Sequence, residues 1–346
     1  ANKLNRYFLI GGFLQIISVL VQTFFQINKL QDSYDISLTW IGLFNWLPFF
    51  WCFACFKTFL KTSERRKICG IFLISGTFPV LVTGFGQAIF DWDGPFSILN
   101  GLIIWYQRPI ESITGLTGLF NNPNYAGAWL SIVLPFCLAT LINSKRNFLK
   151  LISNFLFSIS ITIATILTNS RSAWIGIFIG VFITYGRESY KYLIRILIIL
   201  FLAISSAIYP ILGSDIQKLL IHLIPQNIIF EFSNFQISRI DIWKSAINAI
   251  LNNPIFGSGA SSFTSIYQLE TGLWKGHSHN LFLELIVSYG IPAGIVIMLT
   301  MISIAYKATH LLFNQSLKIS FYDRSWIASL IIFFTTQLVD VQYFDG

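Results

Sequence analysis

Residues 280–306 read NLFLELIVSYGIPAGIVIMLTMISIAY, an apolar run of 27 residues in which Glu284 is the one charged side chain. The hydrocarbon core of a bilayer is about 30 Å thick, and about 20 residues of α-helix cross it. Lipid offers the main chain no hydrogen-bond partner, so a crossing segment must satisfy its own backbone groups. We therefore predict a transmembrane helix over residues 280–306.

The rest of the chain has the same character. Of its 346 residues, 54% are hydrophobic and 11% are charged, whereas about 25% of the residues in an average soluble protein are charged. This composition excludes an ordinary soluble enzyme, a disordered tail and a nucleic-acid-binding module. We predict an all-α, polytopic membrane helix bundle with nine spans, at residues 8–28, 37–57, 68–90, 125–143, 149–168, 170–186, 192–212, 280–306 and 325–344.

The distribution of charge predicts the orientation of these spans. With a cytoplasmic N-terminus, the inner segments hold 16 of the 23 Lys and Arg residues and only three acidic residues. Short cytoplasmic loops of membrane proteins carry such an excess of Lys and Arg. The net charge of +8 is therefore interpreted as a topology signal, and no nucleic-acid partner is expected.

We interpret residues 1–346 as a single membrane domain with one long extracytoplasmic loop. That loop, residues 213–279, lies between the seventh and eighth predicted spans. It is too long for a simple connection, and structureless loops beyond about 12–15 residues are usually functional or disordered. The loop is therefore a candidate for part of a functional site.

One part of this loop is predicted to be an amphipathic helix, Ser238–Asn252. Ile237, Ile240, Trp243, Ile247 and Leu251 recur at three- and four-residue steps, which is the spacing of one helix face. Ser238 and Asp241 resemble a capping box at its start, and the sequence NP at 253–254 is expected to end it. A helix of this kind outside the membrane lies on the lipid surface or covers a cavity.

Two arginines are candidates for anion binding. Arg171 is the second residue of the sixth predicted span, which follows the fifth with almost no loop between them, so it is expected at or below the outer interface. It is either an interfacial arginine whose head reaches toward water or a clamp for phosphate oxygens, which its planar fork matches. Arg239 lies in the first turn of the predicted outer helix, where the helix dipole disfavours a cation. It is either solvated or a second phosphate contact.

A pair of histidines precedes the eighth span. His277 and His279 lie at the outer membrane boundary, and histidine can act as a general base near neutral pH. They are either interfacial residues or catalytic ones. No third ligand is close in sequence, so no metal is predicted here. Glu284 lies inside the span, and an acid in a membrane segment is a functional suspect by default.

Three further patterns are weaker. The sequence DWD at 91–93 has a spacing used in metal-dependent glycosyltransferases, but it is also typical of a polar turn. The sequence CFAC at 52–55 lies within a span, where redox or metal chemistry is not expected. The sequence NNPN at 121–124 favours a turn, although Asn124 at the entrance of the fourth span could contact a glycan.

Taken together, these residues resemble the O-antigen ligase and polymerase superfamily of membrane proteins. The chain is most similar to cyanobacterial members that have been labelled inorganic-carbon transporters. The likeness covers about residues 70–345, and it consists of the order and spacing of several short motifs. These are GLFNNPNY at 118–125, SRSAW at 170–174, RIDIW at 239–243, NPIFGSG at 253–259, HNLFLE at 279–284 and YG at 289–290.

The resemblance implies a fold of the lipid-donor (GT-C type) glycosyltransferases and a specific reaction. Members transfer a glycan from an undecaprenyl-diphosphate carrier to a lipid or glycan acceptor on the periplasmic face of the inner (plasma) membrane. They need no metal or cofactor and invert the anomeric centre. By position, Arg171 and Arg239 match the arginines implied to bind the diphosphate, and His279 matches the histidine implied to act on the acceptor hydroxyl.

The remaining candidates have weaker support from the resemblance. His277 has no counterpart that we can assign, and we treat His277, Glu284 and Asn124 as supporting residues. Members usually have further spans after the region of residues 340–343, and the chain departs from the family pattern at this point.

Two other functions stay open at this point. The first is a transporter for bicarbonate or another small solute, but transporters often show internal repeats and midplane sites. By eye the sequence has no repeat, and the candidate residues gather toward one predicted face. The second is a non-catalytic scaffold or lipid-glycan binder, which would tolerate the loss of either histidine. Glycan transfer is the function that we expect.

Overall fold

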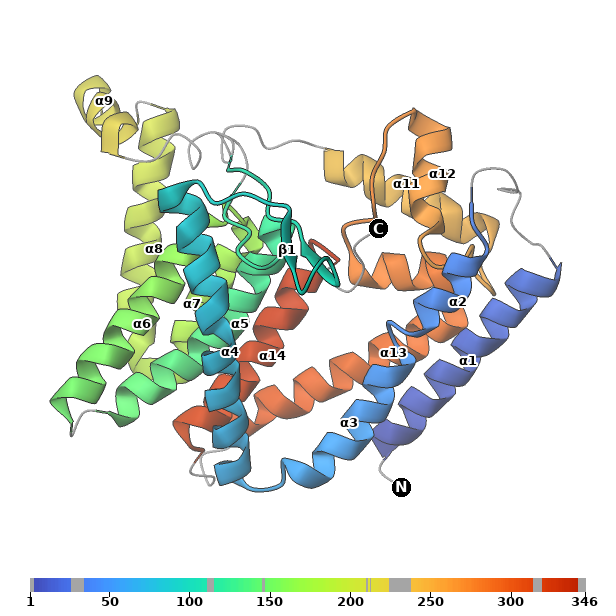
Figure 1. Cartoon of the computed structure of the whole chain (residues 1–346), viewed down its shortest axis with the longest axis horizontal. Coiled ribbons are helices and arrows are strands. Elements are labelled where there is room, and N and C mark those ends of the chain that lie inside the picture. The colour runs from blue at the N-terminus through green and yellow to red at the C-terminus, as the bar shows by residue number, and fades with distance from the viewer. Residues whose placement is uncertain are drawn as a thin grey trace. The chain divides into compact units, whose positions relative to one another are not determined.

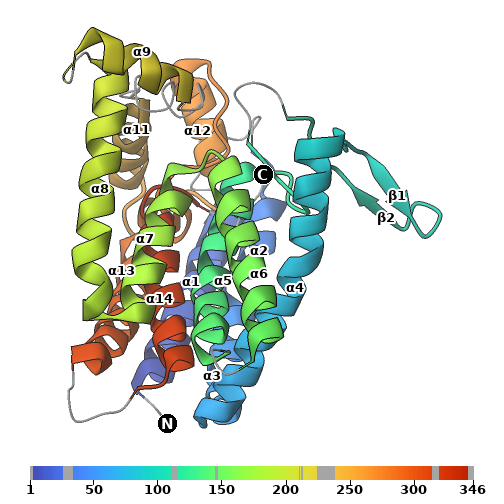
Figure 2. The ribbon, with the colours of Figure 1, turned by 90° about the vertical axis from the view of Figure 1, so that its left-hand side faces the viewer.

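The computed structural model of the chain is built almost entirely of α-helices (Figure 1). It describes residues 3–25, 34–110, 115–144, 147–209, 211, 213–223, 238–313 and 319–341. The helices are α1 (Lys3–Phe25), α2 (Ser37–Leu43), α3 (Leu47–Phe59), α4 (Ser63–Phe90), α5 (Pro123–Asn143), α6 (Phe148–Leu167), α7 (Arg171–Tyr185), α8 (Arg187–Ile208), α9 (Ser214–Leu223), α11 (Ser238–Asn252), α12 (Ser262–Thr271), α13 (Leu281–Phe313) and α14 (Phe321–Gln337). Two short strands, β1 (Phe96–Ile98) and β2 (Ile103–Trp105), pair antiparallel in a hairpin that follows α4 (Figure 2).

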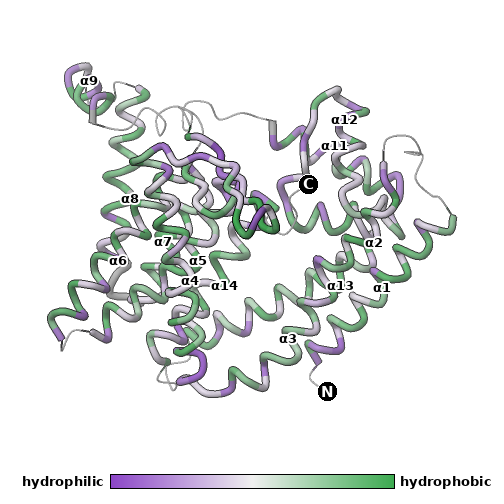
Figure 3. Tube along the Cα trace, in the orientation of Figure 1, coloured by the Kyte–Doolittle hydropathy of each residue, from purple (hydrophilic) through white to green (hydrophobic). Residues whose placement is uncertain are grey.

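The prediction of an all-α, polytopic membrane fold is confirmed. In the described part of the chain, six helices are long and apolar enough to cross a membrane: α1, the α2–α3 pair, α4, α5, α6 and α13. These helices are hydrophobic along most of their length (Figure 3). They coincide with six of the nine predicted spans.

The other three predicted spans fall on shorter helices. α7 has 15 residues, the apolar part of α8 covers Ile194–Ile208, and α14 has 17 residues. α7 begins at Arg171, so it does not gain the preceding turn that a full-length sixth span would require. The turn at 168–170 stays outside the helix, with Asn169 at a positive φ of 55°. The second predicted span is also interrupted, because α2 and α3 are separated at residues 44–46.

The chain forms two compact units, and each is described by itself. Unit 1 comprises residues 1–65, 237–317 and 334–346, and unit 2 comprises residues 66–236 and 318–333. In unit 2, α5 is the central helix and packs against α6 and α7. Its residues Leu130, Val133 and Leu134 form a buried core with Val80 of α4 and Ile161 of α6.

In unit 1, α1 packs along α13, and α11 and α12 pack on α13 as well. The core between α1 and α13 includes Val19, Leu285 and Ile297, all fully buried. α1, α11 and α12 therefore all pack on α13, whereas α2 and α3 pack on α1. α13 also begins directly after the two histidines of interest.

α13 is broken at Gly290, whose φ of 84° and ψ of 167° are not helical. The residues before and after the break form hydrogen bonds with the segment 254–259 instead of within the helix. Main-chain N–H groups of Ser258 and Gly259 donate to the carbonyls of Val287 and Ser288 at 2.7 and 3.1 Å, and the N–H of Ile291 donates to Pro254 at 2.8 Å. The loop therefore satisfies main-chain groups that a break would otherwise leave unpaired in an apolar region.

Side chains of α1 and of the segment before α2 complete this arrangement. Gln22 of α1 donates to the carbonyls of Phe256 and Ser288, and Ser18 also donates to Phe256. The Tyr34 hydroxyl donates to the carbonyl of Ala260 at 2.6 Å. Burial raises the pKa of Tyr34 to about 12, so the hydroxyl keeps its proton at physiological pH. The segment 254–260 is thus fixed from two sides.

The prediction for the outer helix is confirmed in its boundaries, because α11 covers Ser238–Asn252. Of the predicted apolar stripe, however, only Trp243 among the described residues packs in the core of α11, α12 and α13. Ile242, Ala246 and Ala249 are buried against α12 and α13, whereas Ile240, Ile247 and Leu251 are exposed. Small side chains allow the helices to approach closely, and the larger apolar residues remain on the outer face. The proposed cap at Ser238 concerns a side chain outside the described residues.

We predict that Gly290→Ala destabilises unit 1. A Cβ at this position would lie 2.1 Å from the carbonyl oxygen of Ile255, and the backbone conformation is one that only glycine adopts readily. A conformation of this kind costs other residues about 1–3 kcal/mol before any steric overlap is counted. The midpoint of thermal unfolding in detergent micelles should therefore fall by several degrees.

The matched control is Gly76→Ala in α4, where a Cβ would meet no atom within 4 Å. Alanine favours helix over glycine by about 1 kcal/mol, so this variant should unfold at or slightly above the wild-type temperature. A Gly290→Ala protein as stable as the control would contradict the role assigned to the break in α13.

Candidate functional site

The candidate site lies at the start of α13, in unit 1. Asn280 caps this helix, because its side-chain oxygen accepts the N–H groups of Phe282 and Leu283 at 3.0 and 3.1 Å. The Asn280 side-chain amide also donates to the carbonyl of Leu338 at 3.0 Å. The cap therefore fixes the residue before it, His279, and brings the segment after α14 next to the helix start.

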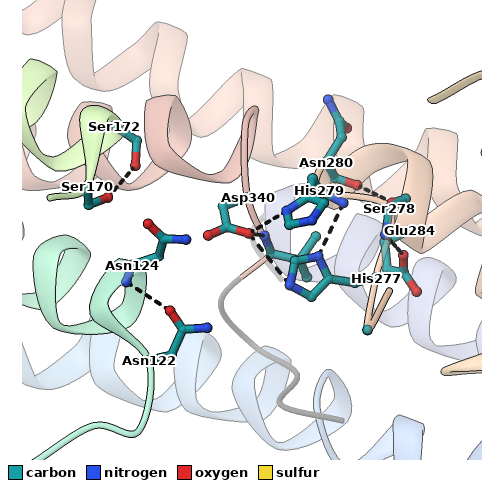
Figure 4. A network of polar contacts seen from close by, with 12 residues as sticks. Asn122, Asn124, Ser170, Ser172, His277, Ser278, His279, Asn280, Glu284 and Asp340 are labelled. Atoms are coloured by element: carbon teal, nitrogen blue, oxygen red, sulfur yellow. Dashed lines mark hydrogen bonds and ion pairs between the residues drawn. The ribbon is translucent and has the colours of Figure 1, made fainter. Parts of the chain in front are cut away.

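Asp340 brings the two histidines together (Figure 4). Its Oδ1 atom lies 3.1 Å from Nδ1 of His279 and 3.5 Å from Nε2 of His277. The carboxylate is almost fully buried, and 12% of the His277 side chain and 25% of the His279 side chain are exposed. Oδ1 also accepts the main-chain N–H of Val341 at 3.0 Å. The two rings meet edge to face, with their centroids 4.5 Å apart.

The hydrogen bonds indicate which tautomer each ring adopts when it is neutral and Asp340 is ionised. An ionised carboxylate only accepts, so His279 donates from Nδ1 to Asp340 and keeps its lone pair on Nε2. His277 accepts the main-chain N–H of His279 at its Nδ1, at 3.2 Å, so its proton is on Nε2 and faces Asp340. Of the two histidines, His279 is therefore the one whose lone pair, on Nε2, the described residues leave for a substrate.

The same three side chains have the composition of a metal site. Among the described residues, His277, His279 and Asp340 are the one group whose ligand atoms could hold an ion, and these atoms lie within 4.8 Å of one another. A metal at Nε2 of His277 would have to displace its proton while Nδ1 still accepts a main-chain N–H. Neutral imidazole cannot do both. The geometry therefore fits a hydrogen-bonded triad better than a metal centre, and metal independence stays a prediction.

Glu284 is buried and has a structural contact in the site. Its carboxylate accepts the main-chain N–H of Ser278 at 2.8 Å, which pairs a buried donor in the turn between the two histidines. The side chain of Ser278 donates to the carbonyl of Asn280 at 3.1 Å. Glu284 thus supports the conformation of the segment 277–280 from inside the helix.

The predicted arginines lie in different units. Arg239 is the second residue of α11, as predicted, and belongs to unit 1 together with both histidines and Glu284. Arg171 is the first residue of α7 and belongs to unit 2, with Asn124. Both arginine side chains are partly buried. The meeting of Arg171, Arg239 and His279 in one pocket stays a prediction.

In unit 2, the stretches around Asn124 and Arg171 are neighbours. Asn122 caps α5 by accepting the N–H of Asn124 at 2.8 Å, so the sequence NNPN forms the start of this helix. A Cβ at Gly127 would lie 2.8 Å from the Cβ of Ala173 and 2.9 Å from Oγ1 of Thr168. The first turn of α5 therefore packs closely against the start of α7.

The weaker patterns gain no support as metal sites. The two acids at 91 and 93 are exposed, and Asp91 has a positive φ of 52°, as in a turn. Neither they nor Cys52 and Cys55 belong to a possible ligand group in the described part of the chain.

The sequence analysis missed Asp340 as a site residue. It lies 61 residues after His279, and the sequence analysis includes it only in the region after which related proteins have further spans. A signal was present, because an acid within an apolar segment is a functional suspect. The same argument had singled out Glu284.

Parts of the chain are similar to known proteins. Residues 155–298 match the O-antigen ligase family, Wzy_C. The chain is also 28% identical over 192 residues to the "ComP-specific O-oligosaccharyltransferase" of Acinetobacter baylyi (strain ATCC 33305 / BD413 / ADP1). The similarity covers 52% of this chain, and the chain spans 33% of that relative. The family match includes Arg171, Arg239, His279 and Glu284, whereas Asp340 lies after it.

We predict that Glu284 contributes to stability through its contact with Ser278. Glu284→Ala leaves a buried N–H without an acceptor, which costs about 1–3 kcal/mol, so its midpoint of thermal unfolding in micelles should fall by several degrees. Glu284→Gln keeps an acceptor oxygen and should unfold closer to the wild-type temperature. Glu64→Ala, at an exposed position in the first turn of α4, is the control. Equal midpoints for Glu284→Ala and this control would exclude the proposed contact.

Proposed function

We propose that the chain is a glycosyltransferase that moves a glycan from a lipid diphosphate carrier to an acceptor hydroxyl. The observation that carries the proposal is the hydrogen bond from Nδ1 of His279 to Asp340, which leaves Nε2 as a base. The match of residues 155–298 to the O-antigen ligase family and the similarity to an oligosaccharyltransferase support glycan transfer as the reaction. The six candidate membrane-spanning helices in the described part of the chain suit a substrate that is held in lipid.

In this proposal His279 activates the acceptor. The acceptor oxygen bonds to the anomeric carbon of the glycan while the bond from that carbon to the diphosphate oxygen breaks. The hydroxyl proton passes to Nε2 of His279, and the electron pair leaves with the diphosphate. Asp340 stabilises the imidazolium that forms, because its carboxylate already accepts a hydrogen bond from Nδ1 of His279, with 3.1 Å between Nδ1 and Oδ1. A single displacement of this kind inverts the anomeric centre.

Arg171 and Arg239 stabilise the leaving group. The departing diphosphate gains negative charge, and a guanidinium presents two parallel N–H donors to phosphate oxygens. Two such groups can supply this stabilisation without a metal ion. Asn124 could contact the glycan from the start of α5, whereas Glu284 acts through the main chain of Ser278.

The distribution of charge along the chain supports one orientation of the protein in the membrane. We propose a multi-pass protein of the inner membrane with a cytoplasmic N-terminus and a periplasmic site. The carrier would be undecaprenyl diphosphate, and the acceptor a glycan or lipid. The excess of Lys and Arg on the opposite side supports this orientation.

We predict that His279→Ala abolishes glycan transfer and leaves donor binding unchanged. The variant removes the base without removing the groups proposed to bind the diphosphate. Transfer from undecaprenyl-diphosphate glycan to acceptor should be measured with the purified protein in nanodiscs, together with the affinity for the donor. His310→Ala, near the other end of α13, is the matched control and should keep full activity.

Normal transfer by the His279→Ala protein would remove the base assignment. A parallel assay of labelled bicarbonate uptake in cells that lack the protein tests the transporter alternative. Lost uptake with unchanged surface glycans would favour transport over glycan transfer.

We predict that Arg171→Gln and Arg239→Gln each lower kcat/KM for the donor by about 10- to 100-fold, since a hydrogen bond to a charged group contributes about 1.5–3 kcal/mol. The change keeps length and polarity but removes the charge. Arg195→Gln in α8, at an exposed position on the predicted inner side, should have no effect. If both site variants transfer glycan as well as Arg195→Gln does, the diphosphate contacts lie elsewhere.

A further inference from the structure

We propose that His277 is a positioning residue that holds His279 in its catalytic conformation; this inference rests on the proposed function. The local sequence pattern gives the two histidines no different chemistry, because they are two residues apart at the same helix start. The structure gives them different hydrogen-bond partners. Nδ1 of His277 contacts the main chain of His279, and Nε2 of His277 faces Asp340, which binds the His279 ring.

The first contact is with the main chain of His279. Nδ1 of His277 accepts the N–H of His279 at 3.2 Å. His279 has a positive φ of 53°, in the left-handed region that residues other than glycine adopt uncommonly. Such a conformation persists only where the surroundings hold it in place. The ring of His277 closes this turn in the way that a side-chain carbonyl does in an Asx turn.

The second contact is with the carboxylate that orients the His279 ring. Nε2 of His277 lies 3.5 Å from Oδ1 of Asp340, the same oxygen that accepts from Nδ1 of His279 at 3.1 Å. The His277 contact is the longer of the two. We therefore assign the larger effect to the main-chain contact and the smaller one to Asp340.

These contacts also exclude His277 as the base itself. Its lone pair on Nδ1 is engaged by a main-chain N–H, and its proton on Nε2 faces a carboxylate. Only 12% of its side chain is exposed, compared with 25% for His279. Removal of a group that orients a metal-ligating side chain typically lowers metal affinity or activity by about 10- to 100-fold. We expect a loss of similar size when the group that orients His279 is removed.

Two substitutions separate the contacts. In His277→Asn, the amide oxygen takes the position of Nδ1 and keeps an acceptor for the N–H of His279, but the side chain is too short for Asp340. In His277→Gln, the amide nitrogen approaches the position of Nε2 and keeps a donor to Asp340, but no acceptor replaces Nδ1. His277→Ala removes both contacts, and His310→Asn is the matched control.

The expected result is a loss of about 10-fold or more in kcat for His277→Ala, with KM for donor and acceptor unchanged. His277→Asn should recover most of this rate, and His277→Gln should recover little. Thermal unfolding is measured for each variant, and if His277→Ala does not fold, the comparison of the Asn and Gln variants decides. Wild-type rates in all three variants, a raised KM with unchanged kcat, or recovery by Gln alone would each overturn the proposal.

A second readout does not depend on activity. The chain contains four histidines, so ¹⁵N-histidine labelling gives a small set of ring signals in micelles. The proposal expects His279 to hold its proton on Nδ1 in the wild type and in His277→Asn, and to populate both tautomers in His277→Ala and His277→Gln. An unchanged tautomer in every variant would overturn the positioning role. Normal glycan transfer by His279→Ala, with the tautomers as expected, would instead refute only the proposed function.

Discussion

The need to pair main-chain groups in an apolar environment explains much of unit 1. α13 breaks at Gly290, and the break would leave carbonyls at 287 and 288 and the N–H of residue 291 without helical partners. The segment 254–259 supplies those partners, and Gln22 adds another. Because that segment continues directly from α11, the same hydrogen bonds hold α11 on α13. The positions of Arg239 and His279 relative to one another thus depend on how one interrupted helix is completed.

The sequence predicted the features that depend on local pattern. Apolar runs located the helices, and the periodicity of residues 240–251 together with the NP sequence at 253–254 located α11 to the residue. It did not predict which face of α11 packs, because Ala246 and Ala249 are only weakly hydrophobic. Their contribution is that small side chains let α11 approach α12 and α13 closely. Nor did it identify Asp340, whose partner is 61 residues away. Contacts of that separation depend on the tertiary fold and not on spacing along the chain.

The arrangement at Asp340 shows how one carboxylate can give two identical side chains different chemistry. The same oxygen faces Nδ1 of His279 and Nε2 of His277, and opposite ring nitrogens are therefore protonated. One imidazole keeps an available lone pair, and the other has both nitrogens engaged. The cluster has the composition of a metal site because two imidazoles and a carboxylate can serve either as metal ligands or as the members of a hydrogen-bonded triad.

The short length of α7 has a consequence for the surrounding lipid. A helix of 15 residues is about 22 Å long at 1.5 Å per residue, whereas the hydrocarbon layer is about 30 Å thick. Hydrophobic mismatch of this size is relieved by local thinning of the bilayer or by polar groups that bend toward the interface. If α7 crosses the membrane as the sequence predicts, local thinning would bring the head-group region closer to Arg171, the first residue of this helix. A lipid-borne phosphate could then meet the guanidinium without leaving its own leaflet.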